Sequence, residues 1–301
     1  MDAKTEVKAL TLAVDLDGTL IAADLLWECV FILIRRNMFM AFMIPLWLVL
    51  GGKKRLKHEV FSRVEIDPAS LPYRTEVIDY IKAERKRGRL IVLATASGHK
   101  QAEMIAAHLG LFDDYVGSDA SRNLKSSAKT AHLIDAYGDA GFDYMGNSRD
   151  DLKVFDAARQ AVVVAPDDAA RVWASKNNAR ILADGGRVRL KDYLKMLRVH
   201  QWAKNVLIAV APILDHRFFD ITNIFYVVAA FFAFSFLASA VYVFNDLFDL
   251  SMDRAHPTKC RRPLASGRID AGTGIKFAFG LMAVSVLITM FLPTAFAIVL
   301  L

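Results

Sequence analysis

The chain has 301 residues, of which 54% are hydrophobic and 23% are charged, and it carries a net charge of +6. This length allows one large domain or two ordinary ones. Two stretches without any charged residue, 221–244 and 277–301, are each long enough to cross the core of a bilayer. The composition therefore excludes a wholly soluble protein, a disordered chain and a collagen-like chain.

The two cysteines, Cys29 and Cys260, lie far apart in the sequence and lack metal-type spacing. They predict two reduced thiols, and neither a disulfide framework nor a zinc site. The first ten residues are polar and lead into a strand-like run rather than a cleavage site, so no signal peptide is expected. We therefore expect the N-terminal part of the chain in the cytoplasm.

Residues 1–190 are expected to form an α/β domain around a Rossmann-like parallel sheet, with a helical cap over about 24–75. Charged helical stretches separate short apolar runs there, and this alternation is typical of βαβ units. The functional groups of such sheets lie on the loops that leave the carboxyl ends of the strands. The runs interpreted as buried strands are Leu10–Val14, Leu90–Thr95, Phe142–Met145 and Ala161–Ala165.

One stretch inside the expected cap, Asn37–Leu50, carries no charge over 14 residues, and basic residues flank it on both sides. It is too short to span a membrane, and Pro45 interrupts it. Such a segment fits a helix that lies in the interface of an anionic membrane. It fits equally well a buried helical cap over the sheet, and the sequence leaves both interpretations open.

The run VDLDGTL (Val14–Leu20) directly follows the first expected strand. Asp15 and Asp17 can face one site from the turn that leaves this strand. One carboxylate can attack phosphorus while the other protonates the leaving oxygen. Gly18 lets the backbone turn sharply beside a phosphate. An ordinary turn is the alternative, but DxDGT after a strand is a specific pattern.

With this motif the sequence resembles the haloacid dehalogenase superfamily of aspartyl-phosphate phosphatases, in its phosphoserine-phosphatase-like branch. The resemblance covers roughly residues 8–185. The resemblance implies that the Thr95 hydroxyl binds phosphoryl oxygens, although Thr95 taken alone also fits a helix N-cap. It implies that Lys125 neutralises the phosphate, with Lys129, one helical turn on, as the alternative. Alternatively, Lys125 and Lys129 are each a solvated lysine on the surface.

The fourth motif, GNSRDD (Gly146–Asp151), departs from the GDxxxD pattern with which this family holds Mg²⁺. Asn147 stands in place of the first aspartate, while Asp151 is retained. The resemblance implies that Mg²⁺ is held by Asp15, Asp17, Asn147 and Asp151. Because Asn offers only a neutral oxygen and Mg²⁺ prefers carboxylates and water, we expect a phosphatase with a weakened metal site.

Residues 191–301 predict an all-α transmembrane module of about three helices. The expected spans are Trp202–Leu214, 221–244 and 275–301. The loop before the last span has a positive excess, which places it on the cytoplasmic side, and the loop 215–220 is expected outside. The sequence thus predicts a multi-pass protein of the inner (cytoplasmic) membrane with a cytoplasmic N-terminal domain. The basic residues of the loop are Arg254, Lys259, Arg261, Arg262 and Arg268.

The second expected span ends in NDLFDLSMD (Asn245–Asp253). On a helix, Asp246, Asp249 and Asp253 share one face. Carboxylates at the membrane edge are costly unless they are paired or bind a metal. A triad on one face suits Mg²⁺ that bridges to a diphosphate, and the basic loop beyond it can contact phosphate oxygens. A juxtamembrane cap with merely solvated charges is the alternative.

This motif resembles NDxxDxxxD, the first aspartate-rich motif of the UbiA superfamily of membrane prenyltransferases. Leu197–Leu214 and Asp253–Gly267 are similar to its decaprenyl-phosphate phosphoribosyltransferase branch, which moves a phosphoribosyl group from phosphoribosyl diphosphate to a polyprenyl phosphate. Lys204 is a further candidate phosphate contact, or a lysine at the membrane interface. The resemblance implies that Asn245, Asp246, Asp249 and Asp253 hold Mg²⁺–diphosphate and that Lys259, Arg261 and Arg262 bind the phosphates.

The combination of the two halves suggests a role in forming polyprenyl-phosphoryl-D-arabinose for surface glycans or nodulation factors. The transferase product carries a 5-phosphate, and a phosphatase would remove it. UbiA-type enzymes have further spans and a second aspartate-rich motif, so we expect a truncated module, which a second polypeptide could complete. There are two alternatives. One is a phosphatase that the spans anchor among membrane lipids and that acts on a lipid-linked sugar phosphate. The other is a non-catalytic partner subunit. Nucleic acid is not an expected partner.

Overall fold

A computed structural model describes residues 10–119, 124–184, 188–214 and 220–300. The chain divides into two compact units, residues 1–187 and 188–301, and each is described by itself. The loop expected on the outer side of the membrane falls almost entirely on residues 215–219, which lie outside the described residues.

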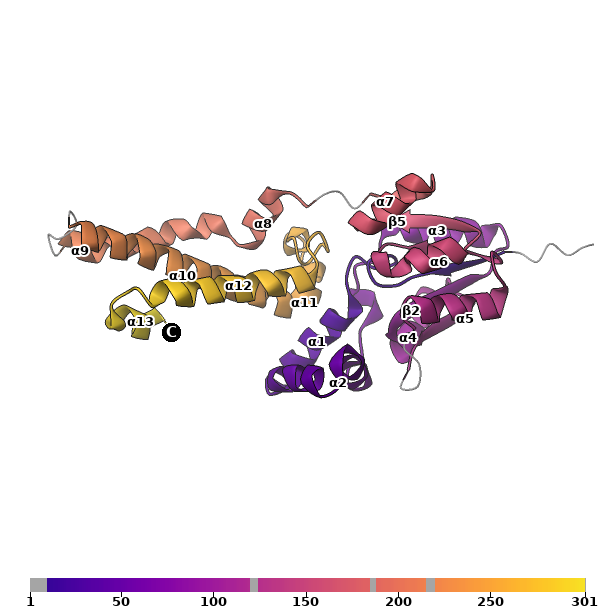
Figure 1. The fold of residues 1–301 in the computed structure, drawn as a ribbon, viewed down its shortest axis with the longest axis horizontal. Coiled ribbons are helices and arrows are strands. Elements are labelled where there is room, and N and C mark those ends of the chain that lie inside the picture. Colours follow the sequence, from indigo (N-terminus) through magenta and orange to yellow (C-terminus); the bar gives the residue numbers. More distant parts are fainter. Residues whose placement is uncertain (1–9, 120–123, 185–187, 215–219, 301) are drawn as a thin grey trace, which may run out of the picture. The chain divides into compact units, whose positions relative to one another are not determined.

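The first unit is built on a six-stranded parallel sheet with the order β3-β2-β1-β4-β5-β6 (Figure 1). The predicted α/β fold with a parallel sheet is confirmed, and each of the four predicted strands is present. The sequence analysis did not predict the short edge strands β3 and β6. The strands are β1 (Thr11–Val14), β2 (Ile91–Gly98), β3 (Asp114–Ser118), β4 (Phe142–Gly146), β5 (Gln160–Val164) and β6 (Arg180–Ala183).

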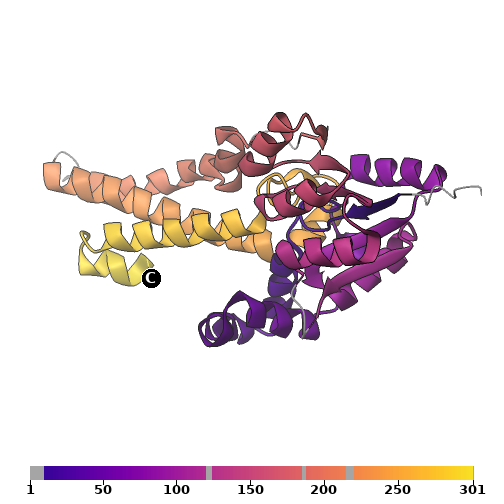
Figure 2. The ribbon, with the colours of Figure 1, turned by 45° about the vertical axis from the view of Figure 1, so that its right-hand side comes forward.

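Helices connect the strands (Figure 2), and their apolar side chains supply the rest of the core. One core cluster joins inward side chains of β1, β4 and β5 to Leu133, Phe155 and Ala174 from three helices. Burial of such apolar side chains is the main favourable term that holds helices on a sheet. The connecting helices are α3 (Thr75–Lys86), α4 (His99–Leu109), α5 (Ser127–Tyr137), α6 (Leu152–Ala157) and α7 (Asp168–Lys176).

The segment between β1 and α3 forms a helical cap made of α1 (Leu25–Arg36), α2 (Met40–Arg63) and the short 3₁₀ helix η1 (Pro68–Ser70). Asp24 begins α1, because its carboxylate accepts a hydrogen bond from the Leu26 backbone N–H at 2.9 Å. In Figure 1 the two cap helices extend away from the sheet.

The cap helix α2 is interrupted at Gly52, where φ is 63° and ψ is −163°. Only glycine adopts this backbone region readily, and the residue divides α2 into an apolar first half and a basic second half. Most side chains of the apolar half are exposed, whereas Trp47 is buried. The interpretation of Asn37–Leu50 as a buried cap helix is therefore wrong for most of this stretch.

The second unit is all-α. Its two long helices, α10 (Ile221–Phe248) and α12 (Ala271–Thr289), pack against each other. The shorter elements are α8 (Leu190–Met196), the 3₁₀ helix η3 (Val199–Ala209), α9 (Val210–Leu214), α11 (Leu250–Ala255), the 3₁₀ turn η4 (Lys259–Arg261) and α13 (Thr294–Leu300). Over the ranges that the structure describes, only α10 and α12 are long and apolar enough to cross a membrane.

The prediction of about three spans is thus not confirmed. The first expected span, Trp202–Leu214, is a 3₁₀ helix followed by a short α-helix. Its polar side chains bind the neighbouring long helix: the Trp202 indole N–H donates to Ser239 Oγ at 2.9 Å, and Asn205 Nδ2 donates to Ser235 Oγ at 2.8 Å. The last expected span, 275–301, is divided, because α12 ends at Thr289, ahead of Pro293, and α13 follows.

Candidate functional site

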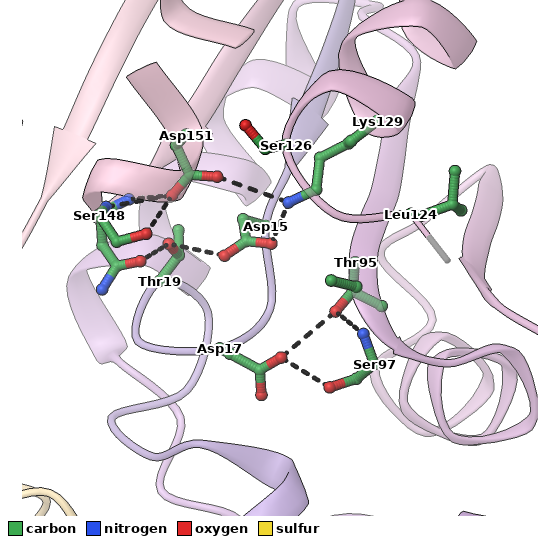
Figure 3. A network of polar contacts seen from close by, with 12 residues as sticks. Asp15, Asp17, Thr19, Thr95, Ser97, Leu124, Ser126, Lys129, Ser148 and Asp151 are labelled. Carbon is green, nitrogen blue, oxygen red and sulfur yellow. Dashed lines mark hydrogen bonds and ion pairs between the residues drawn. The ribbon is translucent and has the colours of Figure 1, made fainter. Parts of the chain in front are cut away.

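The carboxyl ends of β1, β2 and β4 bring the candidate phosphatase residues together (Figure 3). The chain runs outward from β1 to β3 on one side and then returns to β4 on the other, so β1 and β4 flank the switch point of the sheet. Ligands of open α/β sheets bind outside the strand ends at such a point. Asp15 directly follows β1, Thr95 lies in β2, and Asp151 lies just after β4.

Asp15 is the buried carboxylate at the centre of this site, with 6% of its surface exposed. Its Oδ1 accepts a hydrogen bond from Lys129 Nζ at 2.6 Å. Burial raises the pKa of Asp15 to about 7, and the nearby carboxylates of Asp151 and Asp17 add to this effect, while Lys129 opposes it. A carboxyl group that gains or loses its proton near neutral pH is typical of functional sites.

Lys129, and not Lys125, is the lysine that contacts this carboxylate. Lys129 is 4% exposed, and its Nζ also lies 2.9 Å from the Tyr144 hydroxyl and 3.5 Å from Asp151 Oδ1. Burial lowers its pKa, but the charges of Asp15 and Asp151 outweigh burial, and the net shift is upward. Lys125 is half-exposed and forms an ion pair with Asp150 at 3.0 Å.

Asp151 holds the lysine in place. Its Oδ2 accepts hydrogen bonds from the backbone N–H groups of Asn147 and Ser148 and from Ser148 Oγ, each at 3.1 Å. Its Oδ1 accepts a bond from the Tyr144 hydroxyl at 2.7 Å. Burial raises the pKa of Asp151, but Lys129 and these donors outweigh burial and lower it. Asp151 is therefore a charged anchor for Lys129.

Asp17 belongs to a second part of the same site. Its Oδ2 accepts a hydrogen bond of 2.6 Å from Ser97 Oγ and lies 3.5 Å from Thr95 Oγ1, and its Oδ1 accepts the Leu25 backbone N–H at 2.8 Å. Thr95 is fully buried and does not cap the following helix, which Gly98 begins. The sequence analysis missed Ser97, although it stands two residues after Thr95 and strand β2 extends through it.

Gly18 and Asn147 meet next to Asp15. Gly18 has a φ of 75°, and a Cβ atom there would lie only 2.2 Å from Asn147 Nδ2. The positive φ and the lack of space for a Cβ atom each exclude any larger residue at position 18. Thr19 Oγ1 lies 3.4 Å from Asn147 Oδ1 and 3.5 Å from Asp15 Oδ2. A carboxylate oxygen of Asp15 and the neutral amide oxygen of Asn147 thus both lie near the Thr19 hydroxyl.

The donors of this site do not fit a complete Mg²⁺ shell. Both oxygens of Asp151 are occupied by protein donors, and both oxygens of Asp17 accept hydrogen bonds from Leu25 and Ser97. Asp15 and the neutral Asn147 also accept hydrogen bonds, from Lys129 and Thr19, whereas Mg²⁺ demands near-octahedral oxygen ligands. In the described ranges, no three side chains of His, Cys, Asp or Glu gather closely enough to hold a metal ion.

A cationic cavity of about 250 Å³ lies between the second half of α2 and the start of α4, and its lining reaches Gly98, the residue after Ser97. Lys57 projects into this region, and its Nζ donates to the Ala96 carbonyl at 2.9 Å. Burial lowers the pKa of Lys57, although Asp17 and Asp24 counteract this shift. The sequence analysis did not select Lys57 as a site residue. Other basic side chains of the cavity are Lys54, His58, His99 and Lys100.

In the second unit, the end of α10 and the basic loop form a buried ionic cluster. Arg262 Nη1 binds Asp246 Oδ1 at 3.0 Å and Asp253 Oδ2 at 2.6 Å. Arg198 Nη2 binds the same Asp246 oxygen at 2.5 Å. Lys259 Nζ lies 3.9 Å from Asp253 Oδ1. Both aspartates are almost fully buried, so the arginines supply the pairing that such charges require.

The other predicted members of this site lie outside the cluster. The helix breaks at Asp249, between α10 and α11, so the three aspartates do not share one helical face. Asn245, Arg261 and Lys204 are exposed. Arg198, which lies 48 positions before Asp246, was not predicted. The acidic residues hold cations of the protein here, and they do not form a ready Mg²⁺ site.

Curated proteins similar to this chain fall into two groups by coverage. Protein y4nM of Sinorhizobium fredii is 36% identical over 97% of this chain. Decaprenyl-phosphate phosphoribosyltransferase of Corynebacterium glutamicum is 41% identical over 35% of this chain, and nodulation protein NoeC of Azorhizobium caulinodans is 35% identical over 32%. The chain spans 57% of the length of y4nM, 30% of the transferase and 31% of NoeC.

Among solved structures, a substrate-bound phosphoserine phosphatase covers 63% of this chain and 99% of its own, with a TM-score of 0.41 and 14% identity. The family model of the UbiA prenyltransferase family matches residues 206–301. This range contains α10, α12 and the residues of the ionic cluster other than Arg198. The C-terminal part of the chain therefore carries a UbiA family domain.

Proposed function

We propose that the N-terminal unit hydrolyses a phosphate monoester through a phosphoaspartyl intermediate on Asp15. The observation that carries this proposal is the buried arrangement in which Lys129 contacts both Asp15 and Asp151 at the carboxyl ends of β1 and β4. A lysine fixed in this way can neutralise phosphoryl oxygens while the carboxylate attacks.

The reaction has two steps. An ionised Asp15 oxygen attacks phosphorus and forms an acyl phosphate, while Asp17 gives a proton to the departing alcohol oxygen. Water then attacks the same phosphorus, Asp17 takes up a proton from it, and Asp15 is released together with inorganic phosphate. Ser97 and Thr95 fix the Asp17 carboxylate by hydrogen bonds. Lys125 lies further out, where an incoming phosphate could also contact it.

We further propose that the substrate is a polyprenyl-linked pentose 5-phosphate at the inner membrane, on the way to a D-arabinose donor. Support comes from the UbiA family domain and from the relatives named decaprenyl-phosphate phosphoribosyltransferase and NoeC. In this proposal the membrane unit binds polyprenyl phosphate and phosphoribosyl diphosphate, or only presents the lipid product to the phosphatase. The basic residues after α10 favour a cytoplasmic site.

The test uses the full chain in detergent or nanodiscs. Release of inorganic phosphate from p-nitrophenyl phosphate and from polyprenyl-phosphoryl-ribose 5-phosphate would support the hydrolase. Label transfer from radiolabelled phosphoribosyl diphosphate to polyprenyl phosphate would support the transferase. Hydrolysis without label transfer would favour the membrane-tethered phosphatase, and no activity in either assay would favour the non-catalytic partner subunit.

The pH dependence of hydrolysis follows from Asp15. The attacking form is ionised, so the reactive fraction of Asp15 falls about tenfold per pH unit below its pKa of about 7, while the need for a proton on Asp17 limits kcat/KM on the alkaline side. Lys129 lowers this pKa by its charge, so Lys129→Met moves the inflection to higher pH. Lys153→Met removes an exposed lysine and leaves the inflection in place. An unmoved inflection in Lys129→Met would contradict the proposed coupling.

The response to Mg²⁺ follows from Asn147. Replacing Asn147 with Asp adds a charged oxygen beside Asp15, and we expect the half-saturating Mg²⁺ concentration for hydrolysis to fall about tenfold. Asn178→Asp makes the same charge change at an exposed position and serves as the control. If both variants respond to Mg²⁺ as the wild type does, Asn147 does not limit cation binding.

A further inference from the structure

The apolar tip of the cap is an exposed surface that the proposed hydrolase does not use. We call residues 38–50 the cap tip. Phe39, Phe42, Leu46 and Val49 follow one another at spacings of three and four, so they lie along one face of the helix. Their exposed fractions range from 44% to 84%, and those of Met38, Leu48 and Leu50 from 43% to 68%. Contiguous apolar patches of this kind mark interaction sites.

The cap tip is held in place by the rest of the cap. Trp47 is 4% exposed, and the Arg63 guanidinium lies over its ring at 5.2 Å from the ring centre. The turn before the helix is fixed by Asn37, whose side chain accepts a hydrogen bond from the Phe39 backbone N–H at 3.0 Å. Helices α1 and α2 pack against each other. The exposed apolar face therefore belongs to a packed element with a defined orientation.

The charge around the cap tip has one sign. Residues 29–58 contain six Lys and Arg side chains and no Asp or Glu. Arg35 and Arg36 precede the apolar face, and Lys53 and Lys54 follow it; all four are exposed. An apolar face flanked by basic side chains matches the surface of a bilayer with anionic headgroups, where apolar groups insert and basic groups remain among the phosphates.

We propose that the cap tip docks on the surface of an anionic lipid bilayer, in addition to the membrane-spanning helices of the second unit. Phe39, Phe42, Leu46 and Val49 enter the boundary between headgroups and acyl chains, and the basic flanks contact the headgroups. Beyond Gly52, the second half of α2 lines the cavity between α2 and α4, whose lining reaches Gly98, the residue after Ser97. Docking then holds this cavity at the lipid surface, where the lipid-linked substrate of the proposed function resides.

The test measures how deeply the cap tip enters the lipid. The 301-residue chain with Cys260→Ser is placed in nanodiscs, and Cys29 is kept because it is buried. An environment-sensitive fluorophore is attached at Phe42→Cys or, as a matched control, at Leu90→Cys. Leu90 is 49% exposed and lies at the amino end of β2, the edge of the sheet opposite to the cap. Nitroxide groups on the lipid acyl chains quench fluorophores that reach them.

We expect the Phe42 probe to be quenched at least about threefold more than the Leu90 probe in discs that contain phosphatidylglycerol. Pure phosphatidylcholine, or the pair Arg36→Glu and Lys53→Glu, should reduce this quenching to about half or less. Equal quenching of the two probes would overturn the proposal. So would protection of the Phe42 probe from aqueous iodide without quenching by lipid, because a protein surface would then cover the cap tip. None of these readouts depends on hydrolase activity.

Discussion

The variant Asp15→Asn is expected to lose at least about 10³-fold in kcat for phosphate-monoester hydrolysis. The amide has the shape of the carboxylate but cannot attack phosphorus. Because Asn still offers an oxygen to Lys129, and Asp151 still binds Lys129, the fold of the first unit should be preserved. The measurement is phosphate release by the full chain, together with the thermal unfolding midpoint.

Asp150→Asn is the matched control for this variant. Asp150 stands next to Asp151 in the sequence, but its side chain is more than half exposed and pairs with Lys125 on the surface. This change should alter kcat far less than Asp15→Asn does. If Asp15→Asn hydrolyses the substrate as fast as the wild type, Asp15 is not the nucleophile, and the proposed phosphoaspartyl intermediate is wrong.

The variant Arg262→Met is expected to destabilise the second unit by about 3–5 kcal/mol. Arg262 bridges Asp246 and Asp253, whose side chains are 4% and 3% exposed. Among the described residues, Asp253 then keeps an ion pair with Lys259 at 3.9 Å, and Asp246 keeps one with Arg198. Buried carboxylates that lose their partner cost more than the ion pair itself contributes. The measurement is the thermal unfolding midpoint of the full chain in detergent.

Arg261→Met separates this effect from a general loss of positive charge. Arg261 is the neighbouring residue and is exposed. The double variant Arg262→Met with Asp253→Asn should recover part of the lost stability, because it removes the charge that the single variant leaves unpaired. Equal unfolding midpoints for Arg262→Met and Arg261→Met would show that the ionic cluster does not stabilise the unit.

Local sequence patterns were sufficient for the parts of the first unit that depend on short runs of residues. The run ending at Val14 predicted β1, and the DxDG turn therefore placed Asp15 at a strand end. In the same way, the apolar run that ends at Thr95 predicted β2, and the run before Asn147 predicted β4. Each prediction required only the apolar character of a buried strand and the residues that follow it.

Choices that depend on tertiary packing could not be made in this way. Lys125 and Lys129 stand one helical turn apart, and both suit a phosphate site. Helix α5 begins at Ser127, so Lys129 lies in its first turn and points into the core, while Lys125 precedes the helix. The ionic cluster of the second unit also depends on tertiary packing, because no local pattern connects Arg198 with Asp246. Val199–Ala209 forms a 3₁₀ helix with polar contacts to α10, and hydropathy does not record such contacts.

The glycine at position 52 breaks the helical backbone of α2 into two segments, which stay in contact through Trp47 and Arg63. Its backbone lies in a region that only glycine occupies readily, and a Cβ atom there would meet no neighbour within 4 Å. The penalty for replacing it therefore comes from the backbone alone. The kink gives residues 38–50 a direction different from that of the segment that carries Lys57. The exposed apolar face and the cavity lining thus lie on two segments of one cap element, and a substitution in either segment leaves the residues of the other unchanged.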